Sequence, residues 1–135
     1  MLRFAARHAD IVGVNPTLPS STAREQAALD STPRRMDEKF EWIREAAGDR
    51  FGDLVFHAWL RLAHVTDDAE KVVAPLTEAF GGSVEDVLAS PVVLVGTVDE
   101  ILRRLRERRE RWGYTYYTIQ QPVTAEFAAV VARLA

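Results

Sequence analysis

Three histidines are the side chains of this sequence that titrate closest to neutral pH. His64 closes the apolar stretch 53–65, where the end of a strand would place it for proton transfer to or from a ligand. The alternative is a structural histidine that only satisfies its neighbours. His57 lies seven residues earlier and faces the opposite side of a strand, so the two rings cannot share a metal. We expect no metal site, because no cysteine or further histidine completes one.

Short catalytic and phosphate-binding motifs are absent from the sequence. It contains no G-x-G-x-x-G, no P-loop and no G-x-S-x-G, and no nucleophile stands beside a base. The net charge of −3 argues against a general nucleic-acid binder. The arginines between Arg103 and Arg111 are interleaved with Glu107 and Glu110, which predicts a solvated helix face; the alternative is a stripe that follows phosphates.

Length and composition are those of one globular domain. The chain has 135 residues, of which 47% are hydrophobic and 27% charged, and it contains no cysteine. Disulfides are therefore excluded. No apolar run approaches the roughly 20 residues of a membrane helix, and the first ten residues do not form a secretory signal. We expect a cytoplasmic protein without membrane partners.

Residues 96–119 form the clearest unit of the sequence, a helix followed directly by a strand. Thr97 and Glu100 form a capping box after Gly96, and Gly113 predicts the end of the helix. Residues 114–119 are aromatic and β-branched, as in a buried strand. The helix should bury an apolar stripe of Val98, Ile101, Leu102, Leu105 and Trp112.

The remaining pattern alternates strands with helices. Strands are predicted at 9–14, 53–65 and 114–119, with a helix as the competing interpretation of 53–65. Helices are predicted at 2–8, from Pro33 to Gly48, from Thr66 to Gly81, at 83–88, and after Thr124 with Phe127, Val130, Val131 and Leu134 inward. Residues 15–30 read as a loop, and 92–96 as a buried connector in preference to a strand.

Strands that alternate with helices predict a parallel sheet with right-handed crossovers. Three such strands have two open edges, and helices packed on one face leave the other apolar face uncovered. Further polypeptide is expected to cover them.

Three segments of the sequence resemble one family. ARHADIVGVNP, TPRRMDEKFEWIREAAGDRF and SPVVLVGTVDEILRRLRERRERWGYTYYTI, in this order and spacing, resemble the C-terminal part of luciferase-like monooxygenases. The likeness is greatest to the branch of deazaflavin (coenzyme F-420)-dependent oxidoreductases. It extends from Leu2 to Ala135.

The resemblance implies an α/β fold, a partial (β/α)₈ TIM barrel made of the C-terminal three to four β/α units with parallel strands. Residues 1–135 would form a single partial domain, since a complete barrel needs about 250 residues. The phosphate-binding loop and the early strands that line the isoalloxazine site would lie in the other half. We therefore expect a truncated product or isolated piece that is inactive or nearly so by itself.

In such a barrel the active face lies at the C-terminal ends of the strands. The implied cofactor is F-420 or FMN, and amide side chains suit the carbonyl and N–H edge of its ring. His64 is the candidate catalytic residue, and the candidate cofactor-binding residues are Asn15, Thr17, Thr66, Gln120 and Gln121. The alternative for each is a turn or cap residue.

The expected partners are a small-molecule substrate, if an N-terminal half completes the barrel, and either that half or a second copy of the chain. Nucleic acid is not expected. The alternative function is a non-enzymatic half-barrel module that associates with itself or with a partner chain.

Overall fold

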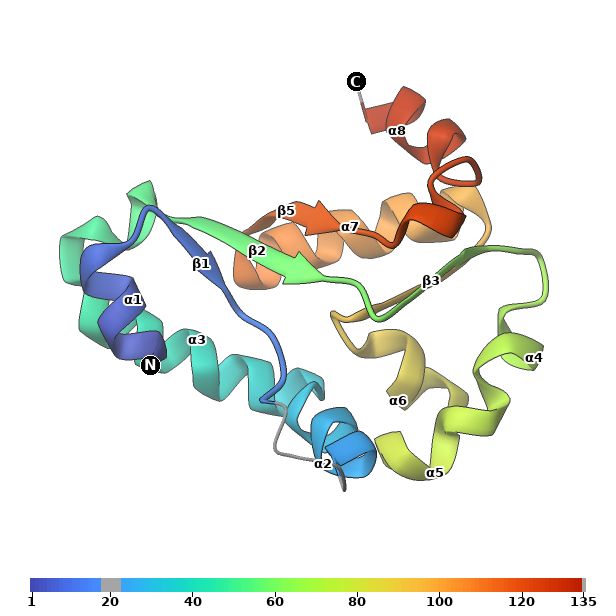
Figure 1. Ribbon diagram of the computed structural model, residues 1–135, viewed down its shortest axis with the longest axis horizontal. Helices are drawn as coiled ribbons and strands as arrows, with labels where there is room; N and C mark the ends of the chain where they lie inside the picture. The colour runs from blue at the N-terminus through green and yellow to red at the C-terminus, as the bar shows by residue number, and fades with distance from the viewer. Residues whose placement is uncertain (18–22, 135) are drawn as a thin grey trace.

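The computed structural model describes residues 1–17 and 23–134, which form mixed α/β structure with parallel strands in two small sheets (Figure 1). One sheet has the order β1–β2–β5 and the other pairs β3 with β4. The described residues form no closed barrel. The strands are β1 (Ile11–Gly13), β2 (Val55–Trp59), β3 (Leu62–Val65), β4 (Val93–Gly96) and β5 (Tyr114–Thr118).

Helices follow or precede every strand. The α-helices are α1 (Leu2–His8), α2 (Ala23–Asp30), α3 (Pro33–Ala47), α4 (Ala69–Val73), α5 (Thr77–Phe80), α6 (Val84–Ala89), α7 (Val98–Trp112) and α8 (Ala128–Leu134). Short 3₁₀ turns are η1 (Gly48–Asp53), η2 (Ala74–Leu76) and η3 (Gln121–Val123). The capping box of α7 and its end at Gly113, which adopts a left-handed conformation, are confirmed.

One face of the β1–β2–β5 sheet packs on helices. Phe56 and Tyr114 from the strands meet Phe40 of α3 edge-on, with ring centroids 5.0 and 5.3 Å apart. Val12 of β1 and Trp112 of α7 belong to the same buried cluster. Aromatic rings in this arrangement bury large apolar areas and fix the helix positions.

The opposite face of this sheet, which we call the open face, is uncovered. Exposed fractions there are 54% for Ile11, 38% for Val55, 40% for Trp59 and 48% for Tyr116. Side chains alternate along a strand, so these residues share one side. The open face consists of Ile11, Gly13, Val55, His57, Trp59, Tyr116 and Thr118. An uncovered apolar face agrees with the expectation from sequence.

The β3–β4 sheet, in contrast, is covered on both faces. Val93 and Val95 of β4 pack in a cluster with Val73 of α4 and Val87 of α6. Leu94, which points to the other side, packs in a cluster with residues of α7 and α8. All four residues of β4 are buried for this reason.

The predicted strand 53–65 is wrong as a single element, and so is the predicted connector 92–96. The N–H of Leu60 donates to Thr118 O at 2.9 Å, whereas the N–H of Arg61 donates to Val92 O at 2.8 Å. The chain thus leaves β5 and joins β4 between these two residues. Pairing with β3 makes 93–96 a strand.

Further corrections concern the helices. The predicted loop 15–30 contains α2, while its residues 18–22 lie outside the described part. The predicted helix 66–81 is divided around Pro75, which lacks an N–H and lies in η2. Thr124 does not cap the last helix, which begins at Ala128; at the end of η3, its hydroxyl donates to Gln121 O.

The inward stripe predicted for the last helix is only half right. Phe127 and Val130 are buried, but Val131 and Leu134 are 62% and 55% exposed. Figure 1 shows why, since α8 extends beyond both sheets and only its first turn meets the core.

Arg108 of α7 is a buried cation that holds the chain before β4. Its guanidinium donates to Leu88 O at 3.2 Å, Ser90 O at 2.8 Å and Val93 O at 2.6 Å, and also to Pro91 O. Burial lowers the pKa of Arg108 to about 10, so it stays charged at neutral pH. The solvated arginine face predicted for 103–111 is therefore wrong at Arg108 and at Arg104, which are 4% and 9% exposed.

Lys39 of α3 is a second buried cation, behind the end of β1. Its ammonium donates to Asp30 Oδ2 at 2.6 Å, Asp30 O at 3.0 Å and Asn15 O at 3.2 Å, which uses all three of its N–H groups. Burial opposes ionisation of Asp30, but hydrogen bonds from Lys39 and from the Thr17 N–H lower its pKa below the ordinary value. The pair joins α2, α3 and β1.

Replacing Arg108 by methionine should lower the free energy of unfolding by about 3 kcal/mol, because several buried carbonyls lose their donors. Urea unfolding measures the change. Arg103→Met is the matched control on the same helix: its exposed pair with Glu107 predicts a loss of at most about 0.5 kcal/mol. Equal losses in the two variants would contradict the role of Arg108.

Asp30→Asn should cost roughly 2 kcal/mol at pH 7, because it leaves the buried Lys39 ammonium without its counter-charge. The folded-state pKa of Asp30 is depressed, so its contribution is complete above the unfolded pKa near about 4 and is lost as pH falls through the folded pKa. Urea unfolding at a series of pH values should show wild type and variant converging below about pH 4.

Asp10→Asn is the control for this experiment, since the Asp10 side chain is 98% exposed. A gap between wild type and Asp30→Asn that stays constant down to acid pH would show that the carboxylate does not stabilise the fold by its charge.

Candidate functional site

Asn15 follows β1 at the carboxyl end of the sheet and joins two strands. Its Oδ1 accepts from the Trp59 N–H at 2.8 Å, which ties the end of β1 to the end of β2. Its Nδ2 lies above Gly13: an ideal Cβ on that glycine would be 3.2 Å away. With its oxygen occupied by the backbone, Asn15 presents its N–H donors to the open face.

His57 of β2 converges on the same point from the next strand. Its Nε2 lies 2.8 Å from Thr118 Oγ1, and its ring centroid is 4.7 Å from that of Tyr116. Its Nδ1 would lie 3.6 Å from a Gly13 Cβ. Because Gly13 has no side chain, the backbone leaves both polar groups uncovered there, and a Cβ would press against the Asn15 amide.

Burial lowers the pKa of His57, which keeps the ring neutral at neutral pH. A neutral imidazole offers one donor and one acceptor, and the bond with Thr118 leaves Nδ1 available. We call Asn15, His57, Trp59, Tyr116 and Thr118 the open-face cluster. Uncharged hydrogen-bonding groups beside exposed aromatic rings suit a planar, polar-edged molecule.

Of this cluster, the sequence pointed only to Asn15. The sequence places His57 opposite His64 and away from any shared metal, and it does not single out Trp59, Tyr116 or Thr118. The available signal was the alternation of 55–59, which places His57 and Trp59 on the face opposite the helices; in 114–118, strict alternation would group Tyr116 with the buried Tyr114. The β-bulge between His57 and its neighbour shifts the register with β5 and could not be foreseen.

His64, the candidate catalytic residue, pairs with a carboxylate that the sequence did not reveal. Its Nδ1 lies 2.6 Å from Glu126 Oε2, which also accepts the Val65 N–H at 3.1 Å. The bond from Val65 and the neighbouring His64 lower the pKa of Glu126. An ionised carboxylate only accepts, so the His64 Nδ1 carries the proton and its Nε2, when the ring is neutral, is free to accept one.

The other predicted site residues are more dispersed. The Thr17 N–H donates to Asp30 Oδ2 at 2.7 Å, and Thr66 Oγ1 accepts from the Asp68 N–H at 3.1 Å. Gln120 and Gln121 follow β5 and are exposed. Within residues 1–17 and 23–134, no hydrogen bond links the side chains of Thr66, Gln120 or Gln121 to the open-face cluster.

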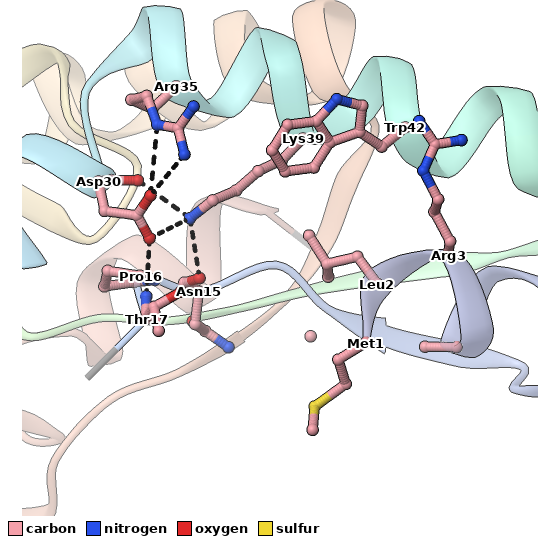
Figure 2. Close-up of a pocket in the computed structure, with 12 residues that line it drawn as sticks. Met1, Leu2, Arg3, Asn15, Pro16, Thr17, Asp30, Arg35, Lys39 and Trp42 are labelled. Carbon is pink, nitrogen blue, oxygen red and sulfur yellow. Dashed lines mark hydrogen bonds and ion pairs between the residues drawn. The ribbon is translucent and has the colours of Figure 1, made fainter. Parts of the chain in front are cut away.

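A cavity of about 880 Å³ lies between α1, α3 and the end of β1. Figure 2 shows its polar wall, where the Lys39 ammonium points between Asp30 and the Asn15 carbonyl while Arg35 reaches the same carboxylate. These charged groups are hydrogen-bonded to one another and to the Asn15 carbonyl. The polar wall therefore stabilises the end of β1, and Asn15 and Gly13, which also line this cavity, connect it to the open face.

The residues present fit one part of the implied cofactor. Ring stacking and edge hydrogen bonds have partners in the open-face cluster, whereas the seven residues of the open face include no cation at neutral pH for a phosphate. The described residues contain no group of three or more His, Asp or Glu side chains placed to hold a metal ion. No described helix is long and apolar enough to cross a membrane.

Comparison with models of known protein families and with curated proteins gave no match. Among solved structures, the chain is similar to the monooxygenase RslO1 from Streptomyces bottropensis, with 21% sequence identity and a TM-score of 0.46. The alignment covers 88% of this chain and 36% of that chain. The chain thus spans well under half the length of this solved structure, and a likeness this distant does not establish an activity.

Proposed function

We propose that this chain supplies the C-terminal strands of a flavin- or deazaflavin-dependent oxidoreductase of the luciferase-like type. The open face is then the interior surface of a barrel that further polypeptide completes. One observation carries the proposal: the open-face cluster joins hydrogen-bonding groups and exposed aromatic rings on a parallel sheet that lacks a second layer. The resemblance of the sequence supports the same family.

The bound cofactor supplies hydride or oxygen chemistry, and the protein positions it. In this proposal Asn15 and His57 would hold the polar edge of the ring, and Tyr116 would offer it an aromatic contact. Further cofactor contacts would come from the same ends of the strands once the barrel is complete, through Thr17, Thr66, Gln120 and Gln121. His64, oriented by Glu126, exchanges a proton with the small-molecule substrate through Nε2.

The isolated chain should bind FMN or F-420 only in the millimolar range and without turnover, because ring contacts alone have few atoms to offset the cost of association. Titration followed by ¹⁵N NMR should shift the amide signals of Gly13, His57, Trp59 and Tyr116. Gly13→Ala places a Cβ beside the Asn15 amide and should abolish these shifts.

Gly52→Ala is the matched control, since a Cβ there would meet nothing within 4 Å. Micromolar binding with turnover would overturn the proposed dependence on a second half. Shifts confined to residues outside the open face would refute the site.

A second candidate function is a non-enzymatic half-barrel that associates with itself. The accessible surface is 8120 Å², whereas a compact monomer of 15.2 kDa is expected to have about 7,100 Å². The excess of about 1,000 Å² is comparable to the roughly 800 Å² that each partner buries in a standard interface.

Light scattering should then report a molar mass that rises with concentration. Tyr116→Asp should weaken this association at least tenfold, because it places a charge within the apolar contact. Val131→Asp, on an exposed residue of α8, is the control and should change little. A wild-type chain that stays monomeric at all concentrations would remove this candidate.

A further inference from the structure

Arg61 lies two residues after the last residue of β2, at the carboxyl end of the open face. Its backbone is fixed where the chain changes sheets, through the N–H that donates to Val92 O. Its guanidinium carbon lies 4.7 Å from the centroid of the Trp59 ring. Since Trp59 belongs to the open-face cluster, the arginine is held above one end of that cluster by a cation–π contact.

This guanidinium has no counter-ion within the described part of the chain. Other arginines on the surface meet carboxylates, as Arg111 does with Asp37 and Arg133 with Asp99, although Arg44, which lies against Phe51, forms no ion pair within the described residues either. No described carboxylate comes within 4.0 Å of Arg61, whose side chain is exposed. Stacking on a ring leaves the N–H donors in the guanidinium plane free to bind an anion.

The spacing to the neutral groups is that of a small aromatic molecule. Trp59 and His57 are two residues apart on one strand, which corresponds to about 6.7 Å. A planar ligand whose polar edge meets His57 and Asn15 would lie along Tyr116 and Trp59, and a substituent at its far end would reach the guanidinium. The seven residues of the open face include no cation of their own.

We propose that Arg61 recognises the anionic group of a planar aromatic ligand bound at the open-face cluster. The inference rests on the proposed function and names its ligand class: an aromatic ring system that carries one phosphate or carboxylate. The phosphate would belong to a cofactor and the carboxylate to a substrate. Both use the same charge-assisted hydrogen bonds to the guanidinium.

Two pairs of probes separate these sources on the full chain, with dissociation constants measured by ¹⁵N NMR titration. FMN and riboflavin differ by a phosphate, and 2-naphthoate and 2-naphthol differ by a carboxylate. The anionic member of at least one pair should bind about tenfold more tightly, as expected for one charge-assisted hydrogen bond. The advantage should shrink as salt is added.

Arg61→Gln should remove this advantage and leave the neutral probes unchanged. Arg44→Gln is the matched control, because Arg44 makes a similar contact with Phe51, at 4.4 Å, outside the open face. An advantage for FMN alone assigns Arg61 to a cofactor phosphate, and one for naphthoate alone assigns it to a substrate carboxylate.

The role of Arg61 would be overturned if the anionic and the neutral probe of each pair bound with equal affinity while the amide shifts stayed centred on the open-face cluster. The proposed function would still stand in that case. An anionic advantage that survives Arg61→Gln would also overturn the role of Arg61. If no probe shifts any open-face residue, the proposed function fails, and this inference fails with it.

Discussion

A parallel sheet needs a layer on each face, and this chain provides both layers for only one of its two sheets. The β3–β4 pair lies between α4 and α6 on one side and α7 and α8 on the other. The β1–β2–β5 sheet has helices on one face alone. The uncovered face carries the exposed aromatic residues and the open space over Gly13. Arg61, which has no ion-pair partner among the described residues, lies beside the same face.

Buried cations hold backbone carbonyls at the entry to β4 and at the end of β1. Arg108 fixes the chain that enters β4, and Lys39 fixes the end of β1 against α2 and α3. Between Leu60 and Arg61 the chain stops pairing with β5 and begins pairing with the segment that leads into β4, so the two sheets are joined at this point. These contacts position the open-face cluster without taking part in it, which is how a scaffold holds a site ready for a ligand.

Local signals predicted the local structure well. The capping box at Thr97 and the stop at Gly113 lie where the sequence placed them, and Asn15 stands at a strand end as predicted. What failed depends on contacts distant in sequence: the split after Trp59, the burial of Arg108, and the pairing of His64 with Glu126, which lies 62 residues away. Periodicity within a window carries no information on such partners.

The central claim is that the open face of the free chain is in contact with solvent while the helix-covered face is not. Hydroxyl-radical footprinting of the dilute, monomeric chain tests it with internal controls. Trp59 and Tyr116 should be modified rapidly, and Trp112 and Tyr114, which are 5% and 1% exposed, should be protected. Protection of Trp59 and Tyr116 equal to that of Trp112 and Tyr114 would contradict the account.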